Sequence, residues 1–318
     1  MARTNFIDLS NISYCGKEAQ DIFSKDIYNI DLRQYGITML EGVKGKMKMY
    51  SGEIGDAYQL YTCSFSPKGA ASLDEAYIEP AAIKVNQENC YDVFWNTFLV
   101  EQTSISLNGG IPQTFGEWYF DKLRQKMAKE YQEIFWQGDA DYSGVTKTYL
   151  AATDGIEKLV AESDATAVSG ADLTVDNILE QVEAVVMAGL GVAAENEVDT
   201  EGYKIFMNHN DVRLLEVALG KLCCGNSTSD RFSNYGRENG RIYIMGFEVV
   251  PSMVSKNFIL FAPARNLVLG FDTMDSRTEY KLIDMRETTG DNMFRVIALT
   301  NIAVGVIVPE LFAYSTGA

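Results

Sequence analysis

Large apolar residues recur at helical spacing most clearly between residues 115 and 135. One face of the predicted helix carries Phe115, Tyr119, Leu123, Met127, Tyr131 and Ile134, with Trp118 and Phe135 beside it. Thr114 and Glu117 fit a capping box at its start, and Gly138 is a typical residue to follow a helix end. The spacing therefore predicts a helix over 114–137, about 35 Å long at about 1.5 Å per residue.

Residues 46–97, which precede this helix, have the character of strands. Lys46–Tyr50 alternates polar and apolar residues, and Tyr58–Ser66 is rich in aromatic and hydroxyl side chains. Pro67–Gly69 is a turn-like break, and the strand pattern resumes at Ala81. A two-stranded excursion of this length builds little core of its own, so we expect another surface to cover it.

The second half of the chain alternates strand and helix patterns after a polar stretch. Small polar residues over 139–170 predict a loop or a weak sheet edge. A second helix is predicted from about Thr174, with Ile178, Val182, Val185 and Val186 on one face and an end at Gly189 or Gly191. A third helix after Asn208–Asp211 carries Val212, Leu215 and Leu219, and 225–240 is expected to be an exposed loop. Strands are predicted at Tyr203–Met207, Arg241–Met245, Phe247–Val250, Phe258–Ala262, Glu279–Met285 and Phe294–Val308, the last two antiparallel. The fold class is α+β.

Charge and composition restrict the kinds of partner. The 44 Asp and Glu residues exceed the 27 Lys and Arg residues, which gives a net charge of −17 over 318 residues. Binding of nucleic acid by a basic face is not expected, because such affinity comes largely from Lys and Arg that neutralise phosphates. No apolar run reaches the roughly 18 residues of a membrane span, and the first residues lack the apolar region of a secretory signal.

Catalytic and metal-binding patterns are scarce. The single histidine, His209, rules out sites with several histidines in one chain, and the five cysteines have no CxxC spacing, which is typical of structural thiols. Asp139–Gly144 resembles the start of a calcium loop, but Leu150 stands where a bidentate Glu belongs. We therefore predict no catalytic, cofactor-binding or metal site, and no enzymatic activity.

The order of these elements carries a resemblance. Tyr203–Leu215 resembles a strand that ends in Met-Asn and leads into a Leu-rich helix. Met245–Pro251 resembles a strand in which a glycine precedes an apolar segment that ends in proline. Phe258–Ala262 and Leu267–Phe271 resemble paired strands that close an inserted domain, and 294–310 resembles a final strand. In this order, the chain resembles a tailed-phage major capsid protein of the Hong Kong 97 type.

The resemblance implies a domain plan. It gives an N-terminal arm at 1–45, an E-loop hairpin at 46–97 and a peripheral (P) domain at 98–170 with the spine helix 114–137. It then gives an inserted axial (A) domain at 171–275 and return strands of the P domain at 276–318. Ser66, Pro67, Lys68 and Gly69, at the predicted hairpin turn, are the expected intersubunit contact.

The resemblance also implies a function. The chain is expected to self-assemble as hexamers and pentamers into an icosahedral head shell that encloses double-stranded DNA without sequence-specific binding. It would be located in the virion capsid after assembly in the host bacterial cytoplasm, without cofactor or membrane, and with separate scaffolding, portal and decoration proteins. The alternatives are an encapsulin-type compartment shell, a cytoplasmic enzyme that uses acidic residues or a divalent metal, and a binding module or tail component.

Overall fold

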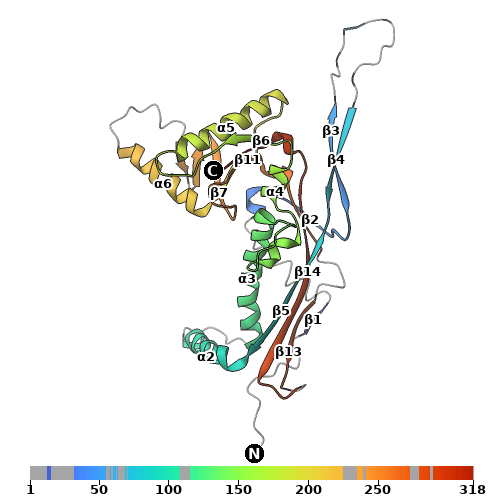
Figure 1. The fold of residues 1–318 in the computed structure, drawn as a ribbon, viewed down its shortest axis with the longest axis vertical. Helices are drawn as coiled ribbons and strands as arrows, with labels where there is room; N and C mark the ends of the chain where they lie inside the picture. The colour runs from blue at the N-terminus through green and yellow to red at the C-terminus, as the bar shows by residue number, and fades with distance from the viewer. Residues whose placement is uncertain are drawn as a thin grey trace, which may run out of the picture. The chain divides into compact units, whose positions relative to one another are not determined.

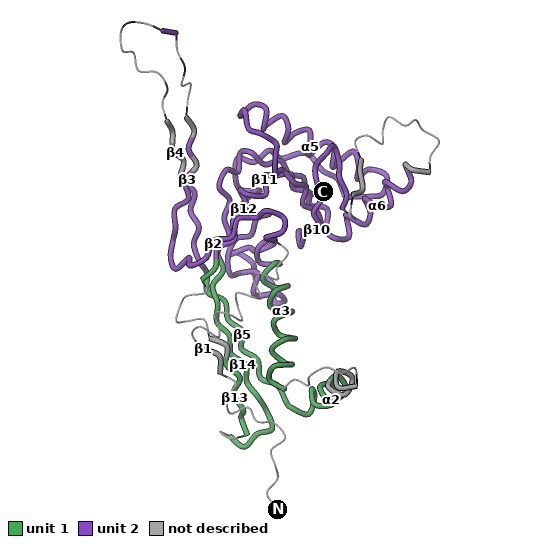
Figure 2. Tube along the Cα trace, turned by 180° about the vertical axis from the view of Figure 1, so that it is seen from behind, with its two compact units in different colours: residues 1–31, 81–132, 271–302 green, residues 32–80, 133–270, 303–318 purple. Residues whose placement is uncertain are grey.

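The computed structural model describes residues 13–15, 32–54, 58, 60, 61, 63, 69, 71–107, 115–224, 235–238, 241–272, 279–286 and 289–317. The chain divides into two compact units, each made of several segments (Figure 2). Unit 1 comprises 1–31, 81–132 and 271–302, and unit 2 comprises 32–80, 133–270 and 303–318. The chain therefore passes between the units several times, and each unit is stabilised by residues that are distant in sequence.

Unit 1 contains an antiparallel sheet centred on the long strand β14 (Met293–Val306), which continues into unit 2 from residue 303. On one side β14 pairs with β13 (Glu279–Asp284), and β13 pairs in turn with β1 (Ser13–Cys15). On its other side β14 pairs with β5 (Ala81–Cys90) over ten residues. The predicted antiparallel pairing of the last two long strands is confirmed.

Helix α3 (Phe115–Gln137) confirms the predicted long helix to within one residue, and Thr114 lies outside the described residues. Its first part buries its apolar face in unit 1. The Tyr119 hydroxyl donates to Gln87 Oε1 at 2.8 Å and accepts from Asn89 Nδ2 at 2.9 Å. Both partners lie on β5, so the helix is fixed on that strand by polar contacts as well as by packing.

Residues 91–97 correct the strand prediction, because helix α2 (Tyr91–Leu107) begins there. Its Tyr91 and Phe98 are buried against the Phe115 ring of α3, with ring centroids 5.3 and 5.5 Å apart. Trp118 Nε1 donates to Glu101 Oε2 at 2.6 Å, and this bond, with Lys122, holds the pKa of the Glu101 carboxyl below its usual value. Contacts with α3 thus define the buried side of α2.

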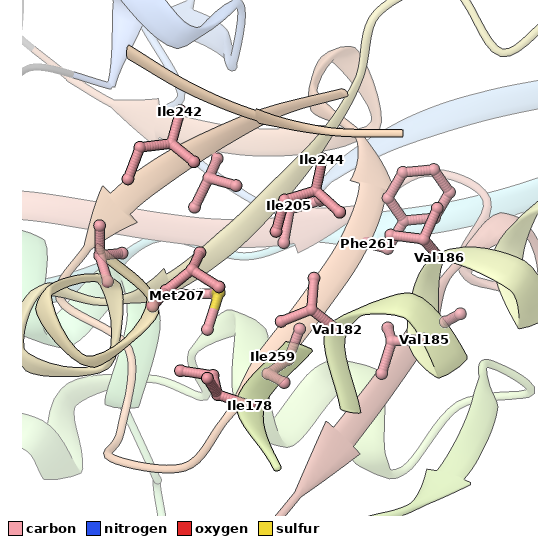
Figure 3. Packing of buried hydrophobic residues seen from close by; sticks show 14 of the residues in the cluster. Ile178, Val182, Val185, Val186, Ile205, Met207, Ile242, Ile244, Ile259 and Phe261 are labelled. Atoms are coloured by element: carbon pink, nitrogen blue, oxygen red, sulfur yellow. The ribbon is translucent and has the colours of Figure 1, made fainter. Parts of the chain in front are cut away.

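Unit 2 is built on a seven-stranded sheet with the strand order β6-β15-β11-β7-β10-β9-β8. The strands are β6 (Thr166–Ser169), β15 (Ala313–Thr316), β11 (Ile259–Pro263), β7 (Tyr203–Asn208), β10 (Phe247–Ser252), β9 (Arg241–Ile244) and β8 (Tyr235–Glu238). Helices α5 (Ile178–Glu195) and α6 (His209–Cys224) cover one face, where Val182, Val185, Ile205 and Phe261 pack together (Figure 3). Phe206 alternates along β7 with Ile205 and Met207 of that cluster. Its ring packs against Trp136, near the end of α3, with ring centroids 5.2 Å apart.

Several predictions in unit 2 need correction. Helix α5 does not end at Gly189 or Gly191 but continues to Glu195. Gly189 lies inside the helix and permits close contact with Phe261, since an added Cβ would lie 2.3 Å from that ring. The 139–170 stretch contains helix α4 (Ile156–Ala161) and the 3-10 turn η2 (Thr148–Ala152), although its strand β6 is indeed a sheet edge. Strand β8 lies within the predicted loop.

Strands β11 and β12 (Leu267–Phe271) do not pair with each other as expected. In the sheet order, β12 lies between β14 and β2 (Thr38–Glu41), whereas β11 lies in the seven-stranded sheet. The turn η4 (Ala264–Asn266) between them carries the chain from one sheet to the other. None of the helices in the described ranges is both long and apolar enough to cross a membrane.

Candidate functional site: the exposed side of the β3–β4 hairpin

Strands β3 (Met47–Ile54) and β4 (Ala71–Ile78) form a separate two-stranded antiparallel sheet (Figure 1). Its register runs in eight consecutive pairs from Met47–Ile78 to Ile54–Ala71. No third strand joins the pair within the described part of the chain. Because opposed residues lie on the same face of a sheet, the register separates an anchored face from an outer face.

The anchored face belongs to the core of unit 2. Met49 and Ile78 are buried in a cluster with Val43, Val268 and Ala303. Two glycines beneath them, one on β12 and one on β14, leave room for this contact. An added Cβ at Gly270 would lie 3.1 Å from Ile78 Cδ1, and one at Gly305 would lie 3.1 Å from Met49 Cε. The base of the hairpin is therefore fixed by close packing.

The outer face combines aromatic and charged side chains. Lys48 Nζ lies 2.6 Å from Glu75 Oε2, and the Tyr77 hydroxyl donates to the same oxygen at 2.7 Å. These two bonds, the one to Lys48 first, hold the pKa of the Glu75 carboxyl below its usual value. Tyr50 and Leu73 are exposed beside them. An exposed strip with aromatic, aliphatic and already paired charged groups is typical of a surface that another protein covers.

Between the two strands, the described residues expose large apolar side chains almost completely. Tyr58 is 95% exposed, and Leu60 and Tyr61 are each 91% exposed. Single exposed apolar residues are common, but three within four positions form a largely exposed apolar segment. This segment is the part of the described hairpin best suited to bind another molecule.

The predicted contact residues lie farther along the same connection. Gly69 is exposed and has φ 83°, a left-handed conformation that favours glycine and fits the predicted turn. Ser66, Pro67 and Lys68 lie outside the described residues. The sequence pattern predicted a strand over Tyr58–Ser66, but Tyr58, Leu60 and Tyr61 lie in no strand.

In Asp139–Gly144, the segment that resembles the start of a calcium loop, the acidic side chains bind the ammonium group of Lys158. Lys158 Nζ lies 2.7 Å from an Asp139 oxygen, 2.8 Å from Asp141 and 2.9 Å from Asp154. The bond to Lys158 is the main reason that the pKa of Asp139 is lowered. The ammonium group thus lies among the carboxylates that could have bound a cation. Among the described residues there is no group of three or more His, Cys, Asp or Glu suited to hold a metal ion.

The remaining candidate residues are not brought together. His209 is the exposed first residue of α6. Cys63, in the hairpin connection, is exposed, and Cys90, at the end of β5, is half-buried; both are free thiols. The side chains of Cys15, Cys223 and Cys224 lie outside those described.

Comparison with known proteins identifies the fold. No protein-family model and no curated protein sequence matches the chain. A chain from the structure of the satellite phage P4 procapsid including size determination (Sid) protein is 11% identical, with a TM-score of 0.57, covering 93% of this chain and 90% of that chain. A chain from the capsid of Myoviridae phage XM1 is also 11% identical, with a TM-score of 0.56 and coverages of 91% and 92%.

A third similar structure is the capsid of an empty GTA particle, 13% identical with a TM-score of 0.51, covering 91% of this chain and 90% of that chain. At these identities the similarity establishes the fold. The chain has the fold of phage capsid proteins, and the predicted α+β fold of the Hong Kong 97 type is confirmed.

Proposed function

We propose that this chain is a major capsid protein, the structural subunit of an icosahedral phage head. The observation that carries the proposal is the match of the fold to phage capsid chains over about nine-tenths of both chains. The subunit would assemble with itself into hexamers and pentamers, without catalysis, and enclose double-stranded DNA. Its location would be the virion capsid, after assembly in the host bacterial cytoplasm with separate scaffolding, portal and decoration proteins.

The exposed side of the hairpin is the proposed contact with a neighbouring subunit. Burial of a large apolar side chain contributes about 1.5–3 kcal/mol, so covering Tyr58, Leu60 and Tyr61 would supply substantial association energy at every subunit. Met49 and Ile78 hold the base of the hairpin in its own subunit. This combination of an anchored base and an uncovered outer part suits an intersubunit clamp. The predicted contact at Ser66, Pro67, Lys68 and Gly69 belongs to the same proposal.

The domain plan also stays a proposal. In it, the E-loop of 46–97, which includes the β3–β4 hairpin, lies between the arm of 1–45 and the P domain of 98–170. The A domain of 171–275 contains α5, α6 and five strands of the seven-stranded sheet. Strand β15 returns to that sheet from the proposed 276–318 segment, and β6 precedes the proposed boundary. Segments outside the A domain would thus complete its sheet.

Electron microscopy and sedimentation of the purified, concentrated protein test the function. The wild-type chain should form closed shells, and the double substitution Leu60→Ser with Tyr61→Ser should give folded subunits that sediment slowly. Val145→Ser is the matched control, because Val145 is 95% exposed in unit 2 outside the hairpin. It should leave shells intact. Absence of wild-type shells under all assembly conditions would overturn the function, whereas normal shells from the double variant would overturn only the clamp.

The contents of shells isolated from a bacterial host separate the phage head from the encapsulin-type alternative. A phage head produced with its partner proteins should contain double-stranded DNA, whereas an encapsulin-type compartment should contain a protein cargo. Nuclease-protected DNA of genome length supports the first of these.

A further inference from the structure

Exposed large apolar side chains gather at two places in the described part of the chain. Six lie on the β3–β4 hairpin and its connection, and three, Val93, Leu99 and Val100, lie on helix α2. The other four each lie on a different segment: Val145, Met187, Val217 and Ile297. Single exposed apolar residues need no explanation, but a group of them marks a surface that another molecule contacts. Helix α2 is therefore a second candidate surface, separate from the hairpin.

The exposed side of α2 is a short helical stripe. Val93 and Val100 are 69% and 71% exposed, and they lie on the same side of the helix because they are seven residues apart. Asn96 and Thr97 are exposed between them, at the three- and four-residue spacing of the same side. We call these four residues the α2 stripe.

The opposite side of α2 is buried within unit 1. Tyr91 and Phe98 pack there against the Phe115 ring of α3. The helix is thus apolar on both sides, a pattern typical of a helix that is covered all round. Among the described residues only one of the two sides is covered, which indicates that a partner contacts the α2 stripe.

Charge indicates the kind of partner. Residues 93–100 include no charged residue, although the chain has a net charge of −17. Two copies of so acidic a chain repel each other over much of their surface and approach most easily where neither presents an acid. The acid next to the α2 stripe, Asp92, accepts a hydrogen bond from Asn292 Nδ2 at 3.0 Å. An uncharged stripe offers nothing to a charged partner, whereas the same stripe on a second copy is apolar, uncharged and of equal length.

We infer that the α2 stripe binds the α2 stripe of a second copy, with the two helices antiparallel about a twofold axis. The axis passes beside Asn96 and Thr97, at the middle of the stripe, and Val93 of each copy packs against Val100 of the other. A twofold contact uses one surface patch twice, and rows of residues three and four apart are the ones that interdigitate between helices. The inference rests on the proposed association of identical subunits and adds to it a contact separate from the hairpin.

The size of the α2 stripe limits the strength of this contact. Four side chains along about 10 Å of helix cover much less than the roughly 800 Å² per partner of a stable interface. The contact should therefore be weak between free subunits and become populated in concentrated or assembled protein.

Disulfide trapping in the concentrated full-length chain tests the inference, because it captures weak contacts. Asn96→Cys places a thiol beside the axis, and mild oxidation with copper phenanthroline should give a dimer in which mass spectrometry finds residue 96 linked to residue 96. Met187→Cys, at a singly exposed position of α5, is the matched control. Its 187–187 link should form at least about tenfold less, since no twofold contact raises the local concentration of that thiol.

Charged substitutions test the antiparallel register. In the Asn96→Cys background, Val93→Lys alone or Val100→Asp alone puts an unpaired charge into the contact and should lower the yield of the 96–96 link about tenfold. The two substitutions together place each lysine beside the aspartate of the other copy, so the yield should return. Positions seven residues apart do not pair within one helix, and the recovery therefore reports a contact between copies.

Three results would overturn the inference. The first is absence of the 96–96 link in concentrated protein, whether or not shells form. The second is a link from residue 96 to the hairpin of another copy in its place. The third is a double variant that traps no better than the single ones. Shells without the link would overturn this contact alone, whereas the link without shells would overturn the proposed function and leave the contact in place.

Discussion

The anchor of the hairpin gives a stability prediction that can be worked from the structure. Ile78 of β4 is completely buried, and Ile78→Ala removes its contact with the core of unit 2. At about 0.8 kcal/mol per buried methylene group, the lost transfer energy is about 2 kcal/mol. A cavity adds to this loss when its walls cannot collapse. Here one wall is Gly270, which has no side chain to move into the space. We therefore expect a loss of about 3–5 kcal/mol.

Equilibrium unfolding in urea measures this loss, with protein dilute enough to stay unassembled. Leu73→Ala, on the outer face of the same strand, is the matched control. Leu73 is 62% exposed, so its truncation should change the free energy of unfolding by less than about 0.5 kcal/mol. If the free energy of unfolding of Ile78→Ala lies within about 1 kcal/mol of the wild-type value, the hairpin base is not part of the core and the anchor assignment is wrong.

A second variant tests directly whether Gly270 leaves room for the Ile78 side chain. Gly270→Ala alone should destabilise, because its Cβ would lie 3.1 Å from Ile78 Cδ1, from Val43 Cγ2 and from the Ala303 Cβ. In the Ile78→Ala background the first of these contacts is gone, and the added methyl group fills part of the cavity. The double variant should therefore be more stable than the sum of the single effects predicts, by about 1 kcal/mol or more in a double-mutant cycle. Simple additivity would refute the packing argument.

Two further predictions concern unit 2. Gly189→Ala should lower the free energy of unfolding by about 1–2 kcal/mol, although alanine favours helices, because the new Cβ would lie 2.3 Å from the buried Phe261 ring; a more stable variant in urea unfolding would contradict this contact. Lys158→Met should destabilise at neutral pH, since three aspartates lose their shared cation. The lowered pKa of Asp139 means that its stabilising contribution is present above about pH 4 and fades below it, so the difference from wild type in thermal melting should shrink as the pH falls through that value.

Elements with one buried face could be predicted from the sequence. In α3, Phe115, Tyr119 and Tyr131 are buried at the spacing that predicted the helix. In β7, Tyr203, Ile205 and Met207 face the core under α5 and α6, and the polar Asn208 precedes the helix start. When one face of an element is buried against a single core, the spacing of its apolar residues indicates whether the element is a helix or a strand.

Elements determined by distant contacts could not be predicted in this way. Helix α2 is rich in aromatic, β-branched and hydroxyl residues, which favour strands, and its buried side is defined by Phe115 and Trp118 of α3. Gly189 was predicted to end the helix because glycine is common at helix ends. In the structure it lies inside α5 and leaves space for the Phe261 ring. The resemblance implied that β12 pairs with β11, but the turn between them carries the chain from one sheet to the other. In each case a tertiary contact overrides the local preference.

The hairpin shows which exposed residues a sequence pattern can identify and which it cannot. A two-stranded excursion at 46–97 builds little core of its own, which predicted that another surface covers it. Alternation in β3 does distinguish Met47 and Met49, which face the core, from Lys48 and Tyr50, which do not. Outside the alternating stretches the sequence pattern gives no period, so it cannot separate an aromatic residue that packs inside from one that is exposed to water. Only the exposure of Tyr58, Leu60 and Tyr61 makes that distinction, and a chain that folds alone gains nothing from leaving such groups in water. In the proposed clamp another copy covers them, so substitutions there should change assembly rather than folding.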